Sequence, residues 1–454
     1  MSRHTLTRLA ALLGTAALSV TLLGVPAQAD TARVDPVRYD PVRPGAPAPK
    51  AAATVRVPGS FTGYGFDACT APSQAVMDRW REASPYSAVG IYTGGVNRTC
   101  PQPALTADWV RTQARRGWHL LPIHVGPQSS CAVNREFPVE MSLDRATAEQ
   151  QGRAEARTAV TAARALAIAG GSTLYYDLED YDLGPDDCRQ AALSFLSGWT
   201  KQLHALGFRS GVYSSIGAAI TSLDLADRVS AGSYAMPDDI WFAWGNGRAD
   251  TRTDSRVQSK RWDGHRRIHQ YRLDIVQSYA GSAIKIDQNW VDVGRGSVAS
   301  RSPRLCRGVN VDLRRYPALR RGKRGAAVEA VECLLRKQRF TRVKPDGRYD
   351  ARTVRAVRKA QRRLDLKVTG RVDRRTWVAL LSRGTRPLLK VGETGPNVRR
   401  AQRALGASLR VRVRVDGVVT VRTAALVRRF QKREGLPQTG NVTAVTWRRL
   451  QAGG

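Results

Sequence analysis

The C-terminal part of the chain repeats itself with a period of 70 residues and without a gap. Both copies contain a glycine-rich opening, an Asp-Gly turn, a helix glutamine and a Thr-Trp pair, and apolar residues recur in each at helical spacing. We predict two small all-α modules of three helices each, over residues 307–382 and 387–452. The coinciding positions are Leu319/Leu389, Gly322/Gly392, Gly325/Gly395, Val328/Val398, Asp346/Asp416, Gly347/Gly417, Thr353/Thr423, Val357/Val427, Gln361/Gln431, Gly370/Gly440, Thr376/Thr446, Trp377/Trp447 and Leu380/Leu450.

Residues 59–298 alternate short β-rich runs with helical stretches, which are clearest at 144–169 and 187–206. Eight strands with intervening helices are typical of a (β/α)8-like TIM barrel, so we predict an α/β domain of this class. The connections after the sixth run are short or irregular, and we expect the last three strands to lack full helices. The β-rich runs cover 61–68, 88–93, 119–125, 173–179, 209–214, 240–244, 267–271 and 284–291.

The N-terminus has the pattern of an export signal. A basic stretch precedes an apolar run at 9–23, and Ala27-Gln28-Ala29 offers the small residues that a signal peptidase accepts. We predict a signal peptide at 1–29 and a Pro/Ala-rich linker at 30–58; a retained membrane anchor is the alternative. No later segment approaches ~18 apolar residues, so we expect a secreted, cell-wall-associated protein without a membrane span.

Six cysteines form an even set, which indicates disulfides in an exported protein. There is no CxxC spacing, so the sequence favours neither a zinc cluster nor a redox motif. Sequence does not fix the connectivity. The pairs that we expect are Cys69–Cys100, Cys131–Cys188 and Cys306–Cys333.

The histidines argue against metal chemistry. There are six, and none follows His269, so the repeats hold no histidine for a zinc site. His119 and His124 are five apart on a predicted strand and face opposite sides. A metal-dependent amidase would therefore lack ligands, and we expect no metal and no cofactor.

Charge is divided unequally along the chain. Residues 301–454 contain 41 Lys and Arg against 10 Asp and Glu, a net charge of +31 out of +35 for the whole chain. Such a segment attracts polyanions, although a merely solubilising surface and nucleic-acid binding are alternatives. Outside a cell the abundant polyanions are wall polymers and acidic stem peptides. We therefore expect peptidoglycan and anionic wall polymers as partners, no nucleic acid, and a monomeric protein.

Acidic residues gather at predicted strand ends. Asp177 and Glu179 end the fourth strand on one face, because side chains alternate along a strand. Asp67 ends the first strand, and Asp287 lies in the eighth with Asn289 on the same face. Strand ends line the mouth of a barrel, where such enzymes keep their active sites. Repulsion among the four carboxylates should leave at least one protonated near neutral pH, as a general acid requires.

Four short motifs lie at these positions: Gly65-Phe66-Asp67, Tyr176-Asp177-Leu178-Glu179, His269-Gln270-Tyr271 and Asp287-Gln288-Asn289. With them, residues 61–293 resemble the glycoside-hydrolase-like family first known as domain of unknown function 1906, and more distantly the family 25 lysozymes. The resemblance implies that the Asp-x-Glu pair carries catalysis, with Glu179 as proton donor. His269 stands where the lysozymes have a tryptophan.

The repeats resemble the peptidoglycan-binding-domain-like family over 316–381 and 387–451, through G-x-x-G-x-x-V, D-G, the helix glutamine, T-G and T-W-x-x-L. The resemblance implies binding of wall peptidoglycan, at its stem peptide. The aromatic residue that the family places before the glutamine is Phe430 in the second copy but Ala360 in the first. We therefore expect the first module to be a spacer or a weaker binder.

These observations favour a secreted glycoside hydrolase of the lysozyme type that cleaves a β-1,4 bond of the wall glycan. Glu179 would protonate the leaving oxygen, and Asp177 would stabilise the positive charge or orient an N-acetyl group of the substrate. Asp67 and Asp287 would tune these pKa values. The alternative is a binding protein that holds glycan without cutting it. The candidates for sugar contacts are Tyr213, Gln270, Tyr271, Asn289 and Trp290.

Overall fold

The computed structural model describes residues 53–133, 136–301, 305–306 and 308–454. All described residues belong to one compact unit, which begins at Ala52. The predicted signal peptide and most of the predicted linker therefore lie outside the described residues. Among the helices of the described part, none is long and apolar enough to cross a membrane.

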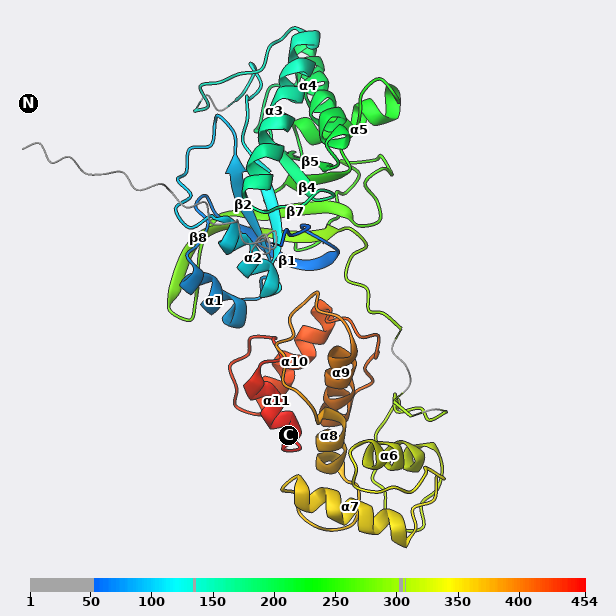
Figure 1. Ribbon diagram of the computed structural model, residues 1–454. Coiled ribbons are helices and arrows are strands. Elements are labelled where there is room, and N and C mark those ends of the chain that lie inside the picture. The colour runs from blue at the N-terminus through cyan, green and yellow to red at the C-terminus, as the bar shows by residue number, and fades with distance from the viewer. Residues whose placement is uncertain (1–52, 134–135, 302–304, 307) are drawn as a thin grey trace, which may run out of the picture. The chain divides into compact units, whose positions relative to one another are not determined.

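Eight strands close into a single barrel in chain order (Figure 1). Strands β1 to β7 run parallel, whereas β8 is antiparallel to both of its neighbours, β7 and β1. The predicted eight-stranded α/β barrel with irregular last strands is confirmed. The strands are β1 Phe61–Asp67, β2 Ala88–Gly94, β3 His119–His124, β4 Thr173–Asp177, β5 Arg209–Ser215, β6 Asp239–Ala243, β7 Arg266–Tyr279 and β8 Ser282–Val293.

The last strand reverses direction because only Ala280 and Gly281 connect it to β7, where Tyr279 pairs with Ser282. Both connecting residues have positive φ, 49° and 75°. A two-residue type I′ turn requires this, whereas a parallel neighbour would need a crossover of roughly a dozen residues. The middle of β8 is thereby brought level with the carboxyl ends of the parallel strands.

Five helices follow the first five strands, and within the described ranges no helix lies between β6 and β8, as expected. Helices α3 and α4 approach closely at Gly152 and Gly198, since a Cβ atom on Gly152 would lie 2.0 Å from the carbonyl oxygen of Phe195. The helices are α1 Gln74–Ala83, α2 Ala107–Arg115, α3 Arg145–Ala165, α4 Asp186–Ala205 and α5 Ala219–Val229.

Side chains fill the inside of the barrel, so it is a packed core and not a channel. Tyr175 and Trp241 meet there edge to face, with ring centroids 5.6 Å apart. The next residue of β4, Tyr176, points to the other face and joins the core between strands and helices. This alternation places Asp177 back on the inner face. Buried residues of the inner cluster are Phe61, Ala88, Leu121, Ile123, Val125, Tyr175, Trp241, Ile268, Val291 and Val293.

Each repeat forms three helices, as predicted: α6 Ala326–Lys337, α7 Ala351–Arg363 and α8 Arg374–Ser382, then α9 Pro396–Leu409, α10 Val421–Arg433 and α11 Ala444–Gln451 (Figure 1). Equivalent residues make equivalent hydrogen bonds. The indole Nε1 atoms of Trp377 and Trp447 each donate 2.7 Å bonds, to the carbonyls of Pro317 and Pro387. The shared residues that define the repeat therefore hold the modules together.

Three disulfides join the pairs that the sequence analysis expects: Cys69–Cys100, Cys131–Cys188 and Cys306–Cys333. The first joins two loops of the barrel domain, the second ties a loop to α4, and the third ties the segment before the first module to α6.

Candidate active site

Two buried carboxyl groups lie at the carboxyl ends of parallel strands. Asp67 is the last residue of β1 and Asp177 the last residue of β4, and their side chains are only 2% and 4% exposed. Glu179 is half-buried and lies two residues beyond β4, which ends earlier than predicted. At Glu179 a side chain replaces the neighbouring strand as the hydrogen-bond partner of the backbone. The backbone N–H of Glu179 donates to Oε1 of Gln128 at 2.8 Å.

Asp287 reaches the same level from the opposite direction. The register of the β1–β8 pair sets it directly across from Asp67. Its Oδ1 accepts a 2.6 Å hydrogen bond from the backbone N–H of Asp274. The antiparallel last strand thus delivers a third carboxyl group that a parallel strand would have carried away from this end.

The side-chain amide of Gln270 lies at the centre of the cluster. Its Nε2 is 3.4 Å from both carboxylate oxygens of Asp67 and donates to Oδ2 of Asp287 at 3.2 Å. Its Oε1 accepts from the hydroxyl of Tyr213 at 2.8 Å. Asn289 adds a 2.5 Å bond from Nδ2 to Oδ1 of Asp67. Gln270, Asn289 and Tyr213 are therefore three predicted sugar contacts that the structure brings to the acids.

The pKa of Asp67 is raised to about 8, first by burial and then by the charge of Asp287. The hydrogen bonds from Asn289 and Gln270 act in the opposite direction but are weaker. Burial likewise raises the pKa of Asp287. Asp67 therefore carries a proton through the neutral range, as repulsion among clustered carboxylates leads one to expect.

Asp177 and Glu179 share a hydrogen bond between their carboxyl groups. The pKa of Asp177 is raised well above its ordinary value by burial and then by the charges of Glu179 and Asp67. The pKa of Glu179 is raised mainly by burial and then by Asp180, while the bond from Asp177 opposes this. In the resting site the proton of the pair therefore resides on Asp177 rather than on Glu179. The Oδ1 atom of Asp177 has no hydrogen-bond partner among the described residues.

Two predicted sugar contacts lie away from the acids. Trp290 follows Asn289 and so points to the other face of β8, where it meets Tyr64 edge-on at 5.0 Å. Tyr271 follows Gln270 and lies near Tyr64 and Tyr279. His269, which stands in the place of a tryptophan, is also on the outer face and stacks on Phe242 at 4.5 Å. The histidine replacement therefore leaves the acid cluster unchanged.

Three residues of the site were missed by the sequence analysis. Tyr92 near the end of β2 points its hydroxyl at Oδ2 of Asp67, 3.5 Å away. Trp241 donates from Nε1 to Oδ1 of Asn289 at 2.8 Å. Gln128 holds β4 by donating to the carbonyl of Asp177 at 2.8 Å. The strand-end rule that selected the acids would have selected Tyr92 as well, whereas nothing in the sequence singles out Gln128.

The four carboxyl groups and the hydroxyl of Tyr213 lie close enough to affect one another's protonation. Tyr213 has its pKa raised by burial and by all four acids, Glu179 first, and Asp177 is its neighbour in the β4–β5 register. Over the described ranges no group of His, Cys, Asp and Glu is arranged to hold a metal ion. A protonated carboxyl beside an ionised one is the arrangement that general acid catalysis needs.

Residues 78–291 match the family described as Rv2525c-like, glycoside hydrolase-like domain. Residues 324–380 and 394–450 each match the putative peptidoglycan binding domain. The two matches agree with the barrel and with the two helical modules. No relative is found among curated proteins.

Several solved structures resemble about half of the chain. An uncharacterized B. stearothermophilus protein is 18% identical over 50% of this chain and 95% of its own, with a TM-score of 0.32. The modular autolysin LytC from Streptococcus pneumoniae is 13% identical over 50% of this chain and 46% of its own, with a TM-score of 0.33. A family 25 glycosyl hydrolase from Bacillus anthracis is 13% identical over 51% of this chain and 89% of its own, with a TM-score of 0.31.

Proposed function

We propose that this chain, in which an Rv2525c-like glycoside hydrolase-like domain precedes two peptidoglycan-binding domains, is a secreted cell-wall glycosidase that cleaves a β-1,4 bond of peptidoglycan. The observation that carries the proposal is the hydrogen-bonded pair Asp177 and Glu179 at the mouth of a closed barrel, beside Asp67 with its raised pKa. The disulfides suit an extracellular protein, since such bonds persist in oxidising surroundings.

Glu179 is the proton donor in this proposal because it is the half-buried member of the pair and Asp177 is almost completely covered. A sugar seated over the mouth removes water from Glu179 and raises its pKa further. The shared proton then passes from Asp177 to Glu179, and Glu179 delivers it to the glycosidic oxygen as the bond between that oxygen and the anomeric carbon breaks.

Asp177, left ionised, stabilises the positive charge on the anomeric carbon or orients the N-acetyl group of the sugar. Water then adds to the anomeric carbon and gives its proton to Glu179, and that proton passes back to Asp177, which restores the resting pair. Asp67 and Asp287, linked through Gln270, set the local charge. Tyr213 is positioned to contact the sugar, since its hydroxyl belongs to the same network.

The second candidate function is glycan binding without cleavage. It is favoured by the burial of Asp67 and Asp177, because only Glu179 among these three is open to a ligand. In that case the carboxyl groups hold sugar hydroxyls through hydrogen bonds and no proton is transferred.

One experiment separates the two functions. The parent protein, Glu179→Gln and the control Asp108→Asn, an exposed acid on α2, are incubated with insoluble peptidoglycan. Reducing ends released into solution and protein found in the pellet are both measured. We expect release by the parent and by Asp108→Asn, none by Glu179→Gln, and equal pelleting of all three. Pelleting of every form without release would overturn the hydrolase proposal and leave the binding function.

A further inference from the structure

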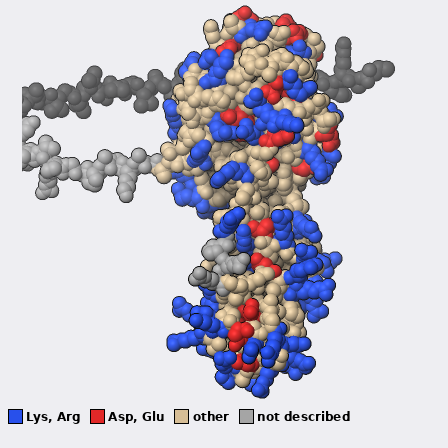
Figure 2. Space-filling view, turned by 90° about the vertical axis from the view of Figure 1, so that its right-hand side faces the viewer, with Lys and Arg blue, Asp and Glu red and all other residues tan. Residues whose placement is uncertain are grey.

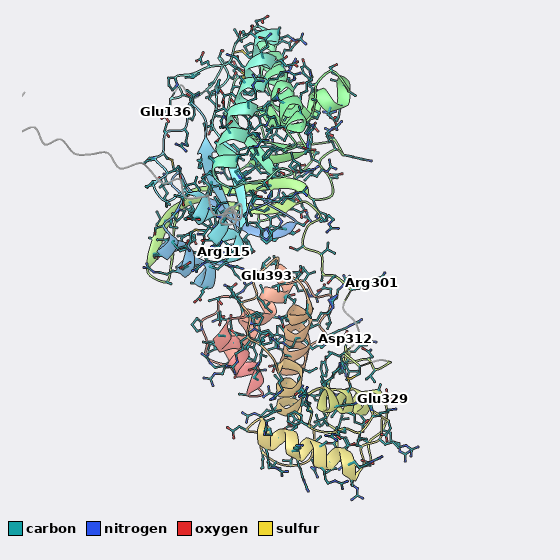
Figure 3. The ribbon with its side chains drawn as sticks, in the orientation of Figure 1. Arg115, Glu136, Arg301, Asp312, Glu329 and Glu393 are labelled. Atoms are coloured by element: carbon teal, nitrogen blue, oxygen red, sulfur yellow. A yellow bond between two sulfur atoms is a disulfide. The ribbon has the colours of Figure 1, made fainter. Side chains whose placement is uncertain are left out.

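The second module contacts the amino-terminal end of the barrel through its residues 389–393, which we call the docking loop. Gly392 of this loop lies against the first residue of β1, because a Cβ atom placed on it would be 2.2 Å from the ring of Phe61. The carboxylate of Glu393 forms a 2.7 Å ion pair with Arg81, near the end of α1 (Figure 3). The loop therefore joins the module to both a strand and a helix of the barrel.

Lys390 is at the centre of this contact. The side chain is completely buried, and its Nζ donates to the carbonyl oxygen of Arg81 at 2.9 Å and to that of Tyr86. It also lies over the ring of Trp118, 5.2 Å from the centroid. The last carbonyl groups of a helix have no partner within the helix and carry partial negative charge, so they suit an ammonium donor. The module thus supplies a donor that the end of α1 needs.

The first module has the same loop but leaves it exposed to solvent. Gly322 and Gly392 have nearly the same φ, 90° and 95°, yet a Cβ atom on Gly322 would meet nothing within 4 Å. Figure 2 shows how densely Lys and Arg cover the visible face of the modules. Four exposed cations of the first module have counterparts that are buried or partly buried in the second: Arg320, Arg321, Lys323 and Arg371 correspond to Lys390, Val391, Glu393 and Asn441.

The modules also cover the strand pair that closes the barrel. Tyr64 of β1 and Trp290 of β8 are partners in the strand register, and both pack against the hydrophobic core that the two modules share. The same register sets Asp67 across from Asp287. A contact that supports this strand pair therefore also supports the acid cluster.

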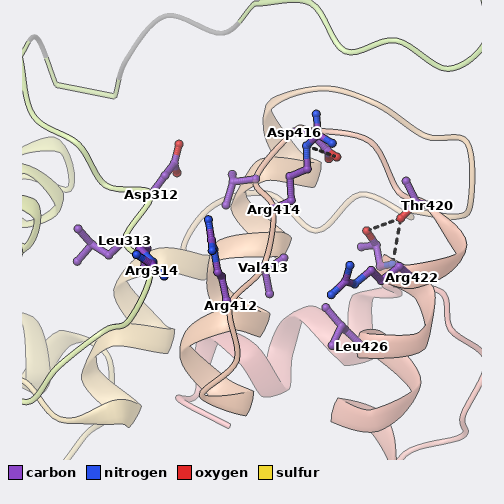
Figure 4. A pocket seen from close by; sticks show the side chains of 12 residues that line it. Asp312, Leu313, Arg314, Arg412, Val413, Arg414, Asp416, Thr420, Arg422 and Leu426 are labelled. Carbon is purple, nitrogen blue, oxygen red and sulfur yellow. Dashed lines mark hydrogen bonds and ion pairs between the residues drawn. The ribbon is translucent and has the colours of Figure 1, made fainter.

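Order along the chain does not explain why the second module is the one that docks. The first module follows the barrel directly, and the segment that leads to it passes along α9 of the second, where Asp312 forms an ion pair with Arg403. Residues 312–314 form one wall of a hollow of about 770 Å³, and residues 412–416 and the start of α10 form the others (Figure 4). The second module is thus held by this segment as well as by the barrel.

We propose that the second module is a fixed base of the barrel domain, which holds β1 and β8 together at the end opposite the acid cluster, and that only the first module leaves the equivalent loop free for a partner. β1 has seven residues and ends at Asp67, so the docking loop lies roughly 20 Å from the mouth and leaves it open. The sequence analysis expected the first module to be the spacer, whereas the docking assigns the structural role to the second. The inference goes beyond the proposed function, since docking requires neither substrate nor cleavage.

Hydrogen–deuterium exchange of the full-length protein, measured by mass spectrometry, tests the docking. Gly392→Ala places a methyl group against Phe61, whereas Gly322→Ala places one in open space. Because the two glycines have nearly the same positive φ, the local strain is matched and only the contact with the barrel differs. We expect exchange in residues 61–64 and 288–293 to be about 10-fold faster in Gly392→Ala and unchanged in Gly322→Ala.

A second pair of variants exchanges residues between the repeats. Glu393→Lys with Asn441→Arg gives the second module the residues with which the first one folds. It removes the ion pair to Arg81 and the 3.0 Å hydrogen bond from Nδ2 of Asn441 to the carbonyl of Ser84. We expect faster exchange at the same barrel residues and a larger radius of gyration in small-angle X-ray scattering. The reverse exchange in the first module, Lys323→Glu with Arg371→Asn, should match the parent in both measurements.

Equal exchange in Gly392→Ala and Gly322→Ala, or unchanged scattering by Glu393→Lys with Asn441→Arg, would overturn the docking. Faster exchange confined to the modules would overturn their role in holding β1 against β8. Far-ultraviolet circular dichroism of each variant checks that the modules remain folded. No substrate enters these measurements, so an inactive barrel leaves their outcome untouched and the result is independent of the Glu179 experiment.

Discussion

The hydroxyl of Tyr213 donates a 2.8 Å hydrogen bond to Oε1 of Gln270 and thereby decides which way that amide faces. With Oε1 occupied, the Nε2 atom can only point toward Asp67 and Asp287. Two acids that repel each other are in this way joined by one donor group. The proton that Asp67 holds and the amide of Gln270 together let the two carboxyl groups lie side by side.

Replacement of that amide should be costly. In Gln270→Glu an oxygen faces the two carboxyl groups where Nε2 stood, so one lost donor and one added repulsion act together. We expect the free energy of unfolding to fall by about 2–3 kcal/mol, measured by urea denaturation. Gln277→Glu, near the β7–β8 turn, is the matched change and should alter stability by less than about 0.5 kcal/mol. A smaller loss for Gln270→Glu than for Gln277→Glu would contradict the role of the amide.

Stability should fall as the pH rises toward about 8. Asp67 has a pKa of about 8 in the folded protein against an ordinary value of 3.8, so the folded state binds its proton more tightly than the unfolded state. The stabilisation from this group is complete below its ordinary pKa and is lost as the pH rises through the window to about 8. Denaturation at several pH values should show this decline in the parent and a flatter profile in Asp67→Asn. Identical slopes in the two proteins would show that Asp67 does not hold the proton.

A methyl group at Gly152 should separate α3 from α4. The added Cβ would stand 2.0 Å from the carbonyl oxygen of Phe195, a backbone atom that cannot rotate away. We expect Gly152→Ala to destabilise the barrel by about 3 kcal/mol, read from the thermal midpoint. Gly170→Ala is the control, since its Cβ would meet nothing nearer than 3.4 Å. If both variants melt together, the helices have more room than their packing indicates.

Loss of the third disulfide should act on the modules and not on the barrel. Cys306 and Cys333 enclose a loop with a sequence separation of 27, and the double change to Ala should cost about 3–4 kcal/mol by the loop-entropy argument. Calorimetric unfolding should resolve a lowered transition for the modules. Removal of Cys69 and Cys100 instead should lower the transition of the barrel. A shift of the same transition by both pairs would mean that the two parts unfold as one.

Local pattern was sufficient to predict the strands, the closed barrel and the two modules, because each depends on apolar periodicity and on turn residues that the sequence shows directly. The ends of β4 and β7 were not predictable in this way. β4 stops at Asp177 because the side chain of Gln128, from another loop, replaces the next strand partner. β7 continues to Tyr279 as an exposed ribbon paired with β8, where the apolar alternation that marks a core strand is weak.

Local sequence pattern likewise predicted some features of the candidate site and not others. Alternation along a strand predicted Asp177 and Glu179 on one face; their carboxyl groups do interact, although β4 ends at Asp177 and Glu179 lies beyond the strand. The same rule, applied to Gln270-Tyr271 and Asn289-Trp290, would have separated the members that face the acids from those that do not. The contact between Asp287 and Asp67 required the register of an antiparallel closure, which no local pattern encodes.

Because β8 closes the barrel against β1, the acid cluster can form only after the last strand has been synthesised. Asp67 belongs to the first strand of the barrel to be synthesised, and its partners Asp287 and Asn289 belong to the last. Until residue 293 has emerged, the first strand has an open edge and the acids have no common mouth. A partly made or partly threaded chain therefore carries no assembled acid cluster, and whatever chemistry the site performs begins only with the complete domain.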